Sequence, residues 1–227
     1  PAITVAGQVM GGNMDTIRWG ILGAAKFARE HMGPAIHAAH GAELVALATS
    51  DAEKAKGFRT FCASLKVHES YEALLADPEI DAVYIPLPNH MHVEWTLKAL
   101  AAGKHVLTEK PIAMQAAEID ALIAARDKAG KLAAEAYMIV HHPQWQTARR
   151  LIAEGAIGTL RHVDTAFTFD KGDEPGNIRN RPETGGGAMY DITGGYGLVW
   201  WIGVGVGAFS ALVHLPIREN RFPIAAT

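Results

Sequence analysis

Cysteine is almost absent from this chain of 227 residues. Cys62 is the only one, so no disulfide can form within the chain, and its cysteine content does not require an oxidising compartment. No apolar run reaches the roughly 18 to 20 residues of a membrane span, and the N-terminus lacks the basic region of a secretory signal. These absences favour a cytoplasmic protein outside the membrane.

Long runs of charge of one sign are also missing. Lys and Arg number 21 against 24 Asp and Glu, which gives a formal net charge of -3. There is therefore no electrostatic case for nucleic acid or an anionic membrane as a partner, and a small neutral or weakly charged ligand is more natural. With 49% apolar residues, the chain can bury a core in one large domain, or in one domain plus a smaller one.

From Met14 onward the sequence alternates short apolar runs with longer amphipathic ones. We expect residues 1–13, which precede this pattern, to be an extension or remnant outside the fold. The apolar runs predict strands at residues 17–23, 42–49, 81–88, 104–109 and 131–138. The amphipathic runs predict helices at residues 26–40, 51–63, 71–77, 92–103 and 116–130.

Strands that read as continuous apolar runs, each separated by a helix, specify a parallel sheet covered on both faces. We therefore predict a doubly wound α/β domain over residues 14–138, in which ligands bind beyond the carboxyl ends of the strands. The texture changes near residue 143, where a helix, an alternating strand and a loop rich in Gly, Pro and Asn follow one another. We assign residues 139–227 to a second, apparently incomplete α+β domain.

The stretch GILGAAKFA, residues 20–28, lies where a dinucleotide-binding fingerprint belongs, between a first strand and its helix. Gly23, Ala25 and Ala28 occupy the three positions at which the usual pattern has glycine, with alanine familiar at the third. Ala25 places a methyl group where the backbone should approach the phosphates, although the free N–H groups of a helix N-terminus still favour an anion. A plain tight turn is the alternative.

The end of the second predicted strand is the place where the adenosine ribose would be recognised. An acidic residue there favours NAD, whereas small polar or basic groups leave room for the 2'-phosphate of NADP. Ser50 and Lys54 favour NADP, and Asp51 is as well explained as the N-cap of its helix. We expect NADP as the cofactor, with NAD as the alternative.

Five stretches in order resemble the glucose-fructose oxidoreductase/inositol dehydrogenase (Gfo/Idh/MocA) family, most of all its sugar and dihydrodiol dehydrogenase branch. They are GILGAAKFA, YIPLPNHMH, TEKP, AEAYMIVHHPQW and GNIRNRPETGGGAMYDI, and they run from Arg18 to about Asp191. The resemblance implies an N-terminal Rossmann domain and a C-terminal domain whose open sheet lines the substrate pocket and often mediates oligomers. A homo-oligomer through the C-terminal domain is therefore expected.

The resemblance also implies a set of cofactor-binding residues around the pyrophosphate, the riboses and the nicotinamide. With Ser50 and Lys54, this set comprises Gly23, Ala24, Ala25, Lys26, Phe27, Ala28, Pro86, Leu87, Asn89, His92, Glu109 and Lys110. In the family the peptide bond between this lysine and its proline is commonly cis. Because an X-Pro bond favours trans by only about 0.5 to 1 kcal/mol, such a bond would be a means of aiming Lys110 into the cleft.

Oxidation of a sugar hydroxyl needs a hydride acceptor beside the carbon and a base or donor beside the oxygen. Lys110 would share that proton or simply hold the hydroxyl, the alternative being a solvated lysine at a strand end. The family's second catalytic element is an aspartate followed four residues later by tyrosine or histidine. Here Gly195 stands four residues after Asp191 and Tyr196 stands five after it.

This displacement matters because one residue turns a helical side chain by about 100°. A loop or bulge at the pair Gly194 and Gly195 would restore the direction of Tyr196. We expect Asp191 and Tyr196 to flank the substrate hydroxyl.

Other candidates are weaker. His142, Trp145 and Arg179 suit a sugar pocket, although such residues are as often used in packing or salt bridges. The histidines at positions 90, 92, 141 and 142 do not specify a metal site, because catalytic zinc needs about three converging protein ligands. We expect no metal.

The resulting hypothesis is an NAD(P)-dependent oxidoreductase that transfers a hydride between nicotinamide and a sugar, cyclic polyol or related hydroxyl or carbonyl compound. The rival is a cofactor-binding protein without turnover, either a sensor or an inactive truncated paralogue. The family's C-terminal domain normally continues well beyond the point where this chain stops. Either the sequence is incomplete, or the second domain is a remnant with exposed strand edges.

Overall fold

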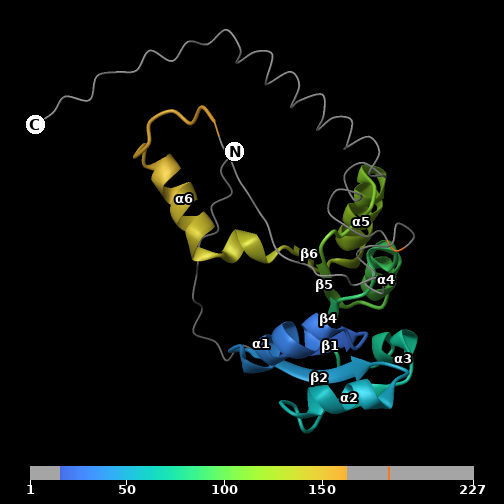
Figure 1. The fold of residues 1–227 in the computed structure, drawn as a ribbon. Helices are drawn as coiled ribbons and strands as arrows, with labels where there is room; N and C mark the ends of the chain where they lie inside the picture. The colour runs from blue at the N-terminus through green and yellow to red at the C-terminus, as the bar shows by residue number, and fades with distance from the viewer. Residues whose placement is uncertain (1–15, 163–183, 185–227) are drawn as a thin grey trace, which may run out of the picture. The chain divides into compact units, whose positions relative to one another are not determined.

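The computed structural model describes residues 16–162 and Thr184. Its central feature is a sheet of six strands in the order β3-β2-β1-β4-β5-β6 (Figure 1). The strands are β1 (Ile17–Leu22), β2 (Ala42–Ala48), β3 (Lys66–His68), β4 (Ala82–Ile85), β5 (His105–Glu109) and β6 (Ala133–Ala136). Every neighbouring pair runs parallel, which confirms the doubly wound α/β fold for this part of the chain.

Helices connect the strands as the amphipathic runs predict. They are α1 (Gly33–Ala38), α2 (Ala52–Arg59), α3 (Tyr71–Leu75), α4 (His92–Ala101), α5 (Ala116–Ala129) and α6 (Pro143–Ala153), with the π-helical segment η1 (Ala28–Met32) and the 3-10 turns η2 (Asn89–Met91) and η3 (Met138–His141). The predicted elements are all present up to α6 and differ mainly in being shorter at their ends. The short edge strand β3 was not predicted.

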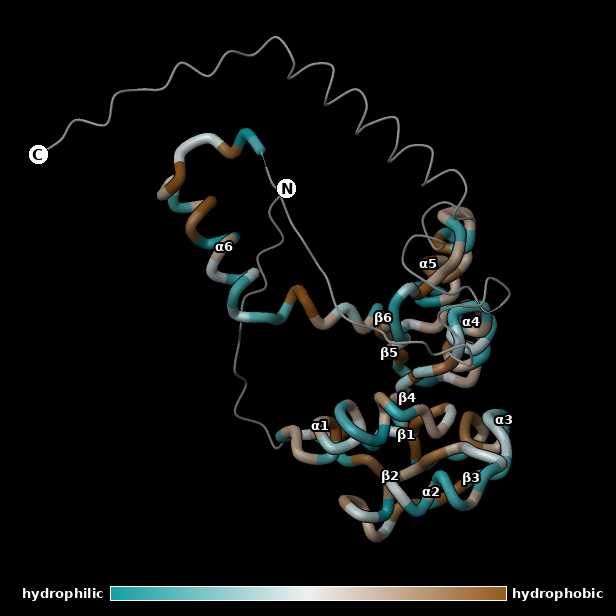
Figure 2. Tube along the Cα trace, in the orientation of Figure 1, coloured by the Kyte–Doolittle hydropathy of each residue, from teal (hydrophilic) through white to brown (hydrophobic). Residues whose placement is uncertain are grey.

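Two apolar cores cover the two faces of the sheet. One contains Val83 and Ile85 of β4 together with buried side chains of α3 and α4, and α5 packs against it. The other contains Tyr84 of β4 together with buried side chains of η1, α1 and α2. Strand β4 is buried along its whole length, so its side chains alternate between two cores. In Figure 2 helix α2 is largely hydrophilic, as expected of a helix that covers a sheet with one face and presents the other to solvent.

Helix ends are fixed by the residues that the sequence indicates. Asp51 is the N-cap of α2, and its Oδ1 accepts hydrogen bonds from the N–H groups of Glu53 at 3.0 Å and Lys54 at 3.2 Å. Helix α5 ends at Gly130, whose φ of 61° is the left-handed conformation common at helix C-termini. The capping function predicted for Asp51 is therefore confirmed.

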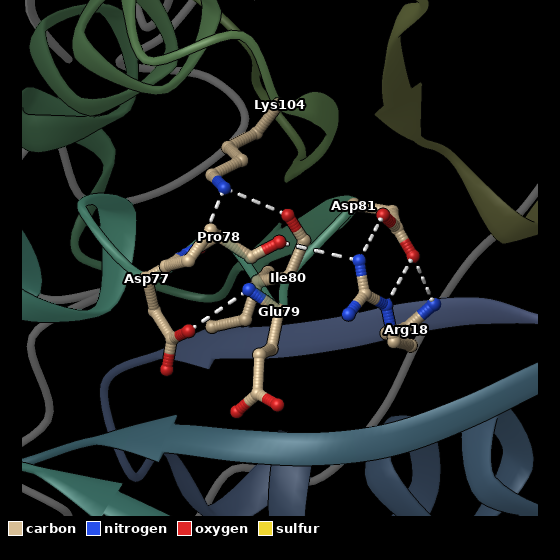
Figure 3. Close-up of polar contacts among 7 residues, drawn as sticks. All are labelled: Arg18, Asp77, Pro78, Glu79, Ile80, Asp81 and Lys104. Carbon is tan, nitrogen blue, oxygen red and sulfur yellow. Dashed lines mark hydrogen bonds and ion pairs between the residues drawn. The ribbon is translucent and has the colours of Figure 1, made fainter.

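Polar contacts fix the loop that leads into β4, at the amino ends of the strands. Arg18 at the start of β1 donates from Nε and Nη2 to the two carboxylate oxygens of Asp81, at 2.9 and 2.8 Å. Lys104, only 6% exposed, donates to the carbonyl oxygens of Asp77 and Ile80, both at 2.7 Å (Figure 3). Burial lowers the pKa of Lys104. These contacts attach the loop to both neighbouring strands.

The pairing of Arg18 with Asp81 predicts how stability depends on acid. The hydrogen bond from Arg18 is the largest cause that lowers the pKa of Asp81 to about 2, from an unfolded value of about 3.9. A folded pKa below the unfolded one means that the pair stabilises the protein above about pH 4, and that this contribution is lost as pH falls toward 2. We expect Asp81→Asn to lower stability at pH 7 and to flatten its decline between pH 4 and 2, measured by urea unfolding.

The control for this experiment is Glu154→Gln, which breaks the exposed pair between Arg150 and Glu154. Exposed pairs contribute little, so its unfolding curve should nearly coincide with that of the parent. Parallel pH dependences for the parent and Asp81→Asn would contradict the assignment.

A buried hydroxyl pair between α4 and β5 gives a second test of the packing. The Oγ1 atoms of Thr96 and Thr108 lie 2.7 Å apart, and both residues are fully buried. We expect Thr108→Val to cost about 1 to 3 kcal/mol of the free energy of unfolding, because it leaves the Thr96 hydroxyl buried without its partner. The double variant Thr96→Val/Thr108→Val should be less destabilised than the sum of the single variants, and a strictly additive result would contradict this account.

Candidate cofactor and catalytic site

The residues predicted to bind the cofactor follow the carboxyl ends of four strands. Gly23 follows β1, Ser50 stands two residues after β2, Pro86 follows β4 and Lys110 follows β5. Since these strands are parallel neighbours, their carboxyl ends lie together along one side of the sheet, which we call the carboxyl edge. This edge is where ligands bind in open α/β sheets, and it lies opposite the ends fixed by Arg18 and Lys104.

The turn after β1 requires glycine at position 23. Its φ is +97°, and its N–H donates to the carbonyl oxygen of Ala48 at 2.9 Å. A Cβ placed at this position would lie 2.8 Å from Leu87 Cδ2 and 3.4 Å from the hydroxyl of Tyr71. The turn after β1 therefore packs directly against the loop after β4, and two of the predicted cofactor-binding segments meet here.

A helix begins immediately after this turn. The N–H of Arg29 bonds to the carbonyl oxygen of Ala25 at 3.0 Å, and the chain is helical from Lys26 onward. Ala28 is fully buried, whereas Ala24, Ala25 and Phe27 are partly exposed. Because this helix begins just after the carboxyl end of β1, the free N–H groups of its first turn lie at that end of the sheet, which favours a bound anion.

The end of β2 carries the residues predicted to read the adenosine ribose. Ser50 and Lys54 are both exposed, and the Nζ of Lys54 lies 3.7 Å from Asp51 Oδ2. Asp51 is engaged as the helix cap, and its own N–H donates to Thr49 Oγ1 at 3.1 Å. The basic and hydroxyl groups that would suit a 2'-phosphate thus lie on the surface at this strand end.

His92 occupies the far end of the loop after β4, and its ring is fully buried. Its Nδ1 lies 2.6 Å from the carbonyl oxygen of Pro111, and its Nε2 lies 2.7 Å from the carbonyl oxygen of Leu87. Both ring nitrogens are therefore engaged by the protein, and neither is left for the cofactor contact that the sequence predicts for His92. In the structure this side chain joins two loops of the protein.

Lys110 is exposed at the end of β5, and the peptide bond between it and Pro111 is cis, as the resemblance implies. Beside it, Glu109 Oε1 accepts a hydrogen bond from the hydroxyl of Tyr84 at 2.6 Å. Burial raises the pKa of Tyr84, and the carboxylate of Glu109 raises it further, so the phenol remains a donor. Tyr84 therefore fixes the orientation of the carboxylate next to Lys110.

His142 and Trp145, predicted to contact substrate, lie at the start of α6. Nδ1 of His142 accepts a hydrogen bond from the N–H of Gln144 at 3.2 Å, so this histidine caps the helix. Trp145 is 38% exposed in the first turn. The remaining predicted residues, Arg179, Asp191 and Tyr196, lie outside the described residues.

Sequence reasoning missed two tyrosines that shape this edge. Tyr84 stands in the middle of an apolar strand, where a single hydroxyl should have suggested a buried partner. Tyr71 lies beside the Gly23 turn and packs edge-on against Trp95, with ring centroids 4.8 Å apart. Burial raises the pKa of Tyr71. The only local sign of the position of Tyr71 in the sequence is that it directly follows Ser70, which caps the helix.

Within residues 16–162, no group of three or more His, Cys, Asp or Glu side chains gathers as a metal site. No helix in the same part of the chain is long and apolar enough to cross a membrane.

Comparison with known proteins gives two family matches. Residues 17–137 match the model of an oxidoreductase family with an NAD-binding Rossmann fold, and residues 145–194 match the GFO/IDH/MocA C-terminal domain. An uncharacterized oxidoreductase of Rhizobium meliloti is 45% identical over 79% of this chain and 53% of its own length. The chain thus spans about half the length of this relative.

A second relative is the dTDP-3,4-didehydro-2,6-dideoxy-alpha-D-glucose 3-reductase of Actinomadura kijaniata, 36% identical over 92% of this chain and 62% of its own length. The D-xylose 1-dehydrogenase (NADP(+)) 2 of Haloferax volcanii is 37% identical over 77% of this chain and 53% of its own. A crystal structure of a 3-ketoreductase from A. kijaniata, a lysine-to-alanine mutant in complex with TDP-benzene and NADP, aligns with a TM-score of 0.60 at 38% identity. The alignment covers 65% of this chain and 46% of that one.

The turn at Gly23 yields a prediction for stability. Gly23→Ala should be destabilising, because alanine at φ +97° is strained by about 1 to 2 kcal/mol and its Cβ would also press on Leu87. Gly130→Ala is the matched control, since its φ is +61° and nothing lies within 4 Å of the added Cβ. We expect urea unfolding to show a larger loss for Gly23→Ala, and equal losses would contradict the close contact with Leu87.

Proposed function

Because the chain belongs to the Gfo/Idh/MocA oxidoreductase family, we propose that it is an NAD(P)-dependent oxidoreductase acting on a sugar or a related hydroxyl or carbonyl compound. The observation that carries the proposal is the meeting of three segments at one edge of the sheet. The glycine turn after β1 contacts Leu87 from the loop after β4, and His92 links that loop to the turn that bears Lys110. A dinucleotide lying along this edge would reach from the helix N-terminus to the lysine.

The residues present fit such a cofactor. At Gly23 a side chain would fill the space beside Leu87, and the adjoining helix offers its first N–H groups to a pyrophosphate. Bound nicotinamide supplies hydride chemistry. On the chain's side, Gly23 to Ala28 hold the phosphates, Pro86, Leu87 and Asn89 border the ribose, and Glu109 and Lys110 border the reactive end.

Lys110 is the group proposed to act on the substrate oxygen. Its amine is exposed beside a turn that is held by Tyr84 through Glu109 and by Glu135, whose Oε1 accepts from the N–H of Ile112 at 2.9 Å. An ammonium fixed at this point donates a hydrogen bond to the oxygen and gives it a proton as a carbonyl is reduced. Asp191 and Tyr196 are proposed to orient the same oxygen.

The preference for NADP rests on Ser50 and Lys54, which leave the adenosine end without a fixed acidic acceptor because Asp51 caps its helix. Relatives support it, since the 3-ketoreductase structure contains NADP and the xylose dehydrogenase bears NADP in its name. We further propose that residues 14–138 bind the cofactor and that residues 139–227 form part of the substrate-binding domain. His142, Trp145 and Arg179 are the proposed substrate contacts. Subunits are proposed to associate through this second region.

The class of substrate is inferred from relatives named for reactions on sugars. Those names include the dTDP-sugar 3-reductase, the xylose dehydrogenase and a 1,5-anhydro-D-fructose reductase. Structures of lysine and tyrosine mutants of the A. kijaniata 3-ketoreductase have been solved, and lysine and tyrosine are the residue types proposed here for proton transfer. A keto sugar or sugar hydroxyl is therefore the first class to assay.

Titration of the purified chain with NADPH and NADH, read by nucleotide fluorescence, tests binding, and a panel of sugars and keto sugars read at the nicotinamide absorbance tests turnover. We expect tighter binding of NADPH and turnover of at least one sugar. Lys110→Met should lower turnover by about 100-fold or more while leaving nucleotide affinity within about threefold, because a proton donor contributes to the chemical step.

The matched control is Lys128→Met, which removes an exposed lysine in the last turn of α5 and should change neither quantity. Failure to bind either nucleotide would overturn the proposal. Binding without turnover of any panel member would favour the rival, a nucleotide-binding protein without catalysis.

A further inference from the structure

We propose that His92 is a positioning residue which fixes the turn bearing Lys110 at a set distance from the loop bearing Leu87. This inference rests on the proposed function for the role of Lys110. The side chain is fully buried at the start of α4, and each ring nitrogen faces one main-chain carbonyl oxygen.

Both partners of the ring belong to the main chain. Nδ1 lies 2.6 Å from the carbonyl oxygen of Pro111, and Nε2 lies 2.7 Å from that of Leu87. Because the ring is fully buried and engaged at both nitrogens, it cannot turn without losing one of these contacts. The side chain therefore links the two segments of main chain at a fixed separation.

The two bonds of His92 complete a chain of contacts across the site. Leu87 packs on the Gly23 turn, where the pyrophosphate is proposed to lie, and its carbonyl oxygen accepts from His92. The other ring nitrogen holds Pro111, the residue directly after Lys110. His92 therefore sets the spacing between the turn proposed to bind the cofactor and the lysine, without itself contacting the cofactor or the substrate.

Two substitutions separate the two bonds. His92→Asn places an amide N–H near the position of Nδ1 and can keep the bond to Pro111, whereas His92→Gln places one near Nε2 and can keep the bond to Leu87. We expect His92→Gln to lower kcat by about 10- to 100-fold with nucleotide affinity nearly unchanged, because the lysine turn is released. His92→Asn should mainly weaken NADPH binding, by about tenfold, because the Leu87 loop is released.

Thr96→Val is the control for simple loss of packing. Thr96 lies one turn further along α4, is fully buried and bonds to Thr108 of β5 rather than to either loop. Like the His92 variants, Thr96→Val should lower thermal stability. Unlike them, it should not lower kcat alone or NADPH affinity alone. The same pattern of kcat and affinity changes in the two His92 variants would overturn the positioning role.

The link is also tested without turnover, by hydrogen exchange of the backbone amides in the absence of nucleotide. Exchange should become faster in the turn that bears Lys110 in His92→Gln, and in the loop that bears Leu87 in His92→Asn. Unchanged exchange in both segments would overturn the positioning role. If the chain proved to lack activity altogether, the proposed function would fail, while the exchange rates would still decide whether His92 holds the two segments.

Discussion

The parallel pairing of β1, β4 and β5 is the constraint on which the rest of the described structure depends. Because β4 is buried on both faces, its backbone bonds can be satisfied only by these two neighbours, and its side chains must suit two cores at once. Because the strands are parallel, their amino ends lie together at one end of the sheet and their carboxyl ends at the other. Loops at the amino ends are fixed by Arg18 and Lys104, and loops at the carboxyl ends carry the residues proposed to bind the cofactor.

Alternation along the strands explains how the Lys110 turn is held from both faces of the sheet. Tyr84 and Glu109 meet on the side of the core that contains α1 and α2. Thr108, the residue before Glu109 in β5, points to the opposite side, which α4 covers. Helix α4 then brings His92 to Pro111, so that both sides of the sheet contribute to the placement of one lysine.

The sequence predicted the regular elements well because their apolar period reflects burial on one or both faces. The edge strand β3 escaped prediction because its three residues include only one apolar side chain, Val67, and its strand conformation comes from pairing with β2. Helix ends did not escape prediction, because the cap at Asp51 and the stop at Gly130 are local signals that need no tertiary contact.

The candidate site was predictable in part for a related reason. Strand ends and the Gly23 turn are local features, so the edge of the sheet and the place of Lys110 could be read from the chain. The role of His92 could not, because its partners are main-chain carbonyls of Leu87 and Pro111, and any residue at those positions would present the same oxygen. Tyr84 was missed because its partner Glu109 lies 25 residues away.

Under the proposed function, cofactor binding and substrate choice fall to different parts of this chain. The residues proposed to bind the cofactor depend largely on main-chain geometry: a positive φ at Gly23, a helix N-terminus and two carbonyl oxygens held by His92. Such features suit phosphates and ribose, and the amine of Lys110 is the group proposed to meet the substrate oxygen. Within the described residues, nothing in this arrangement distinguishes one sugar from another, so the proposed selectivity has to come from other side chains.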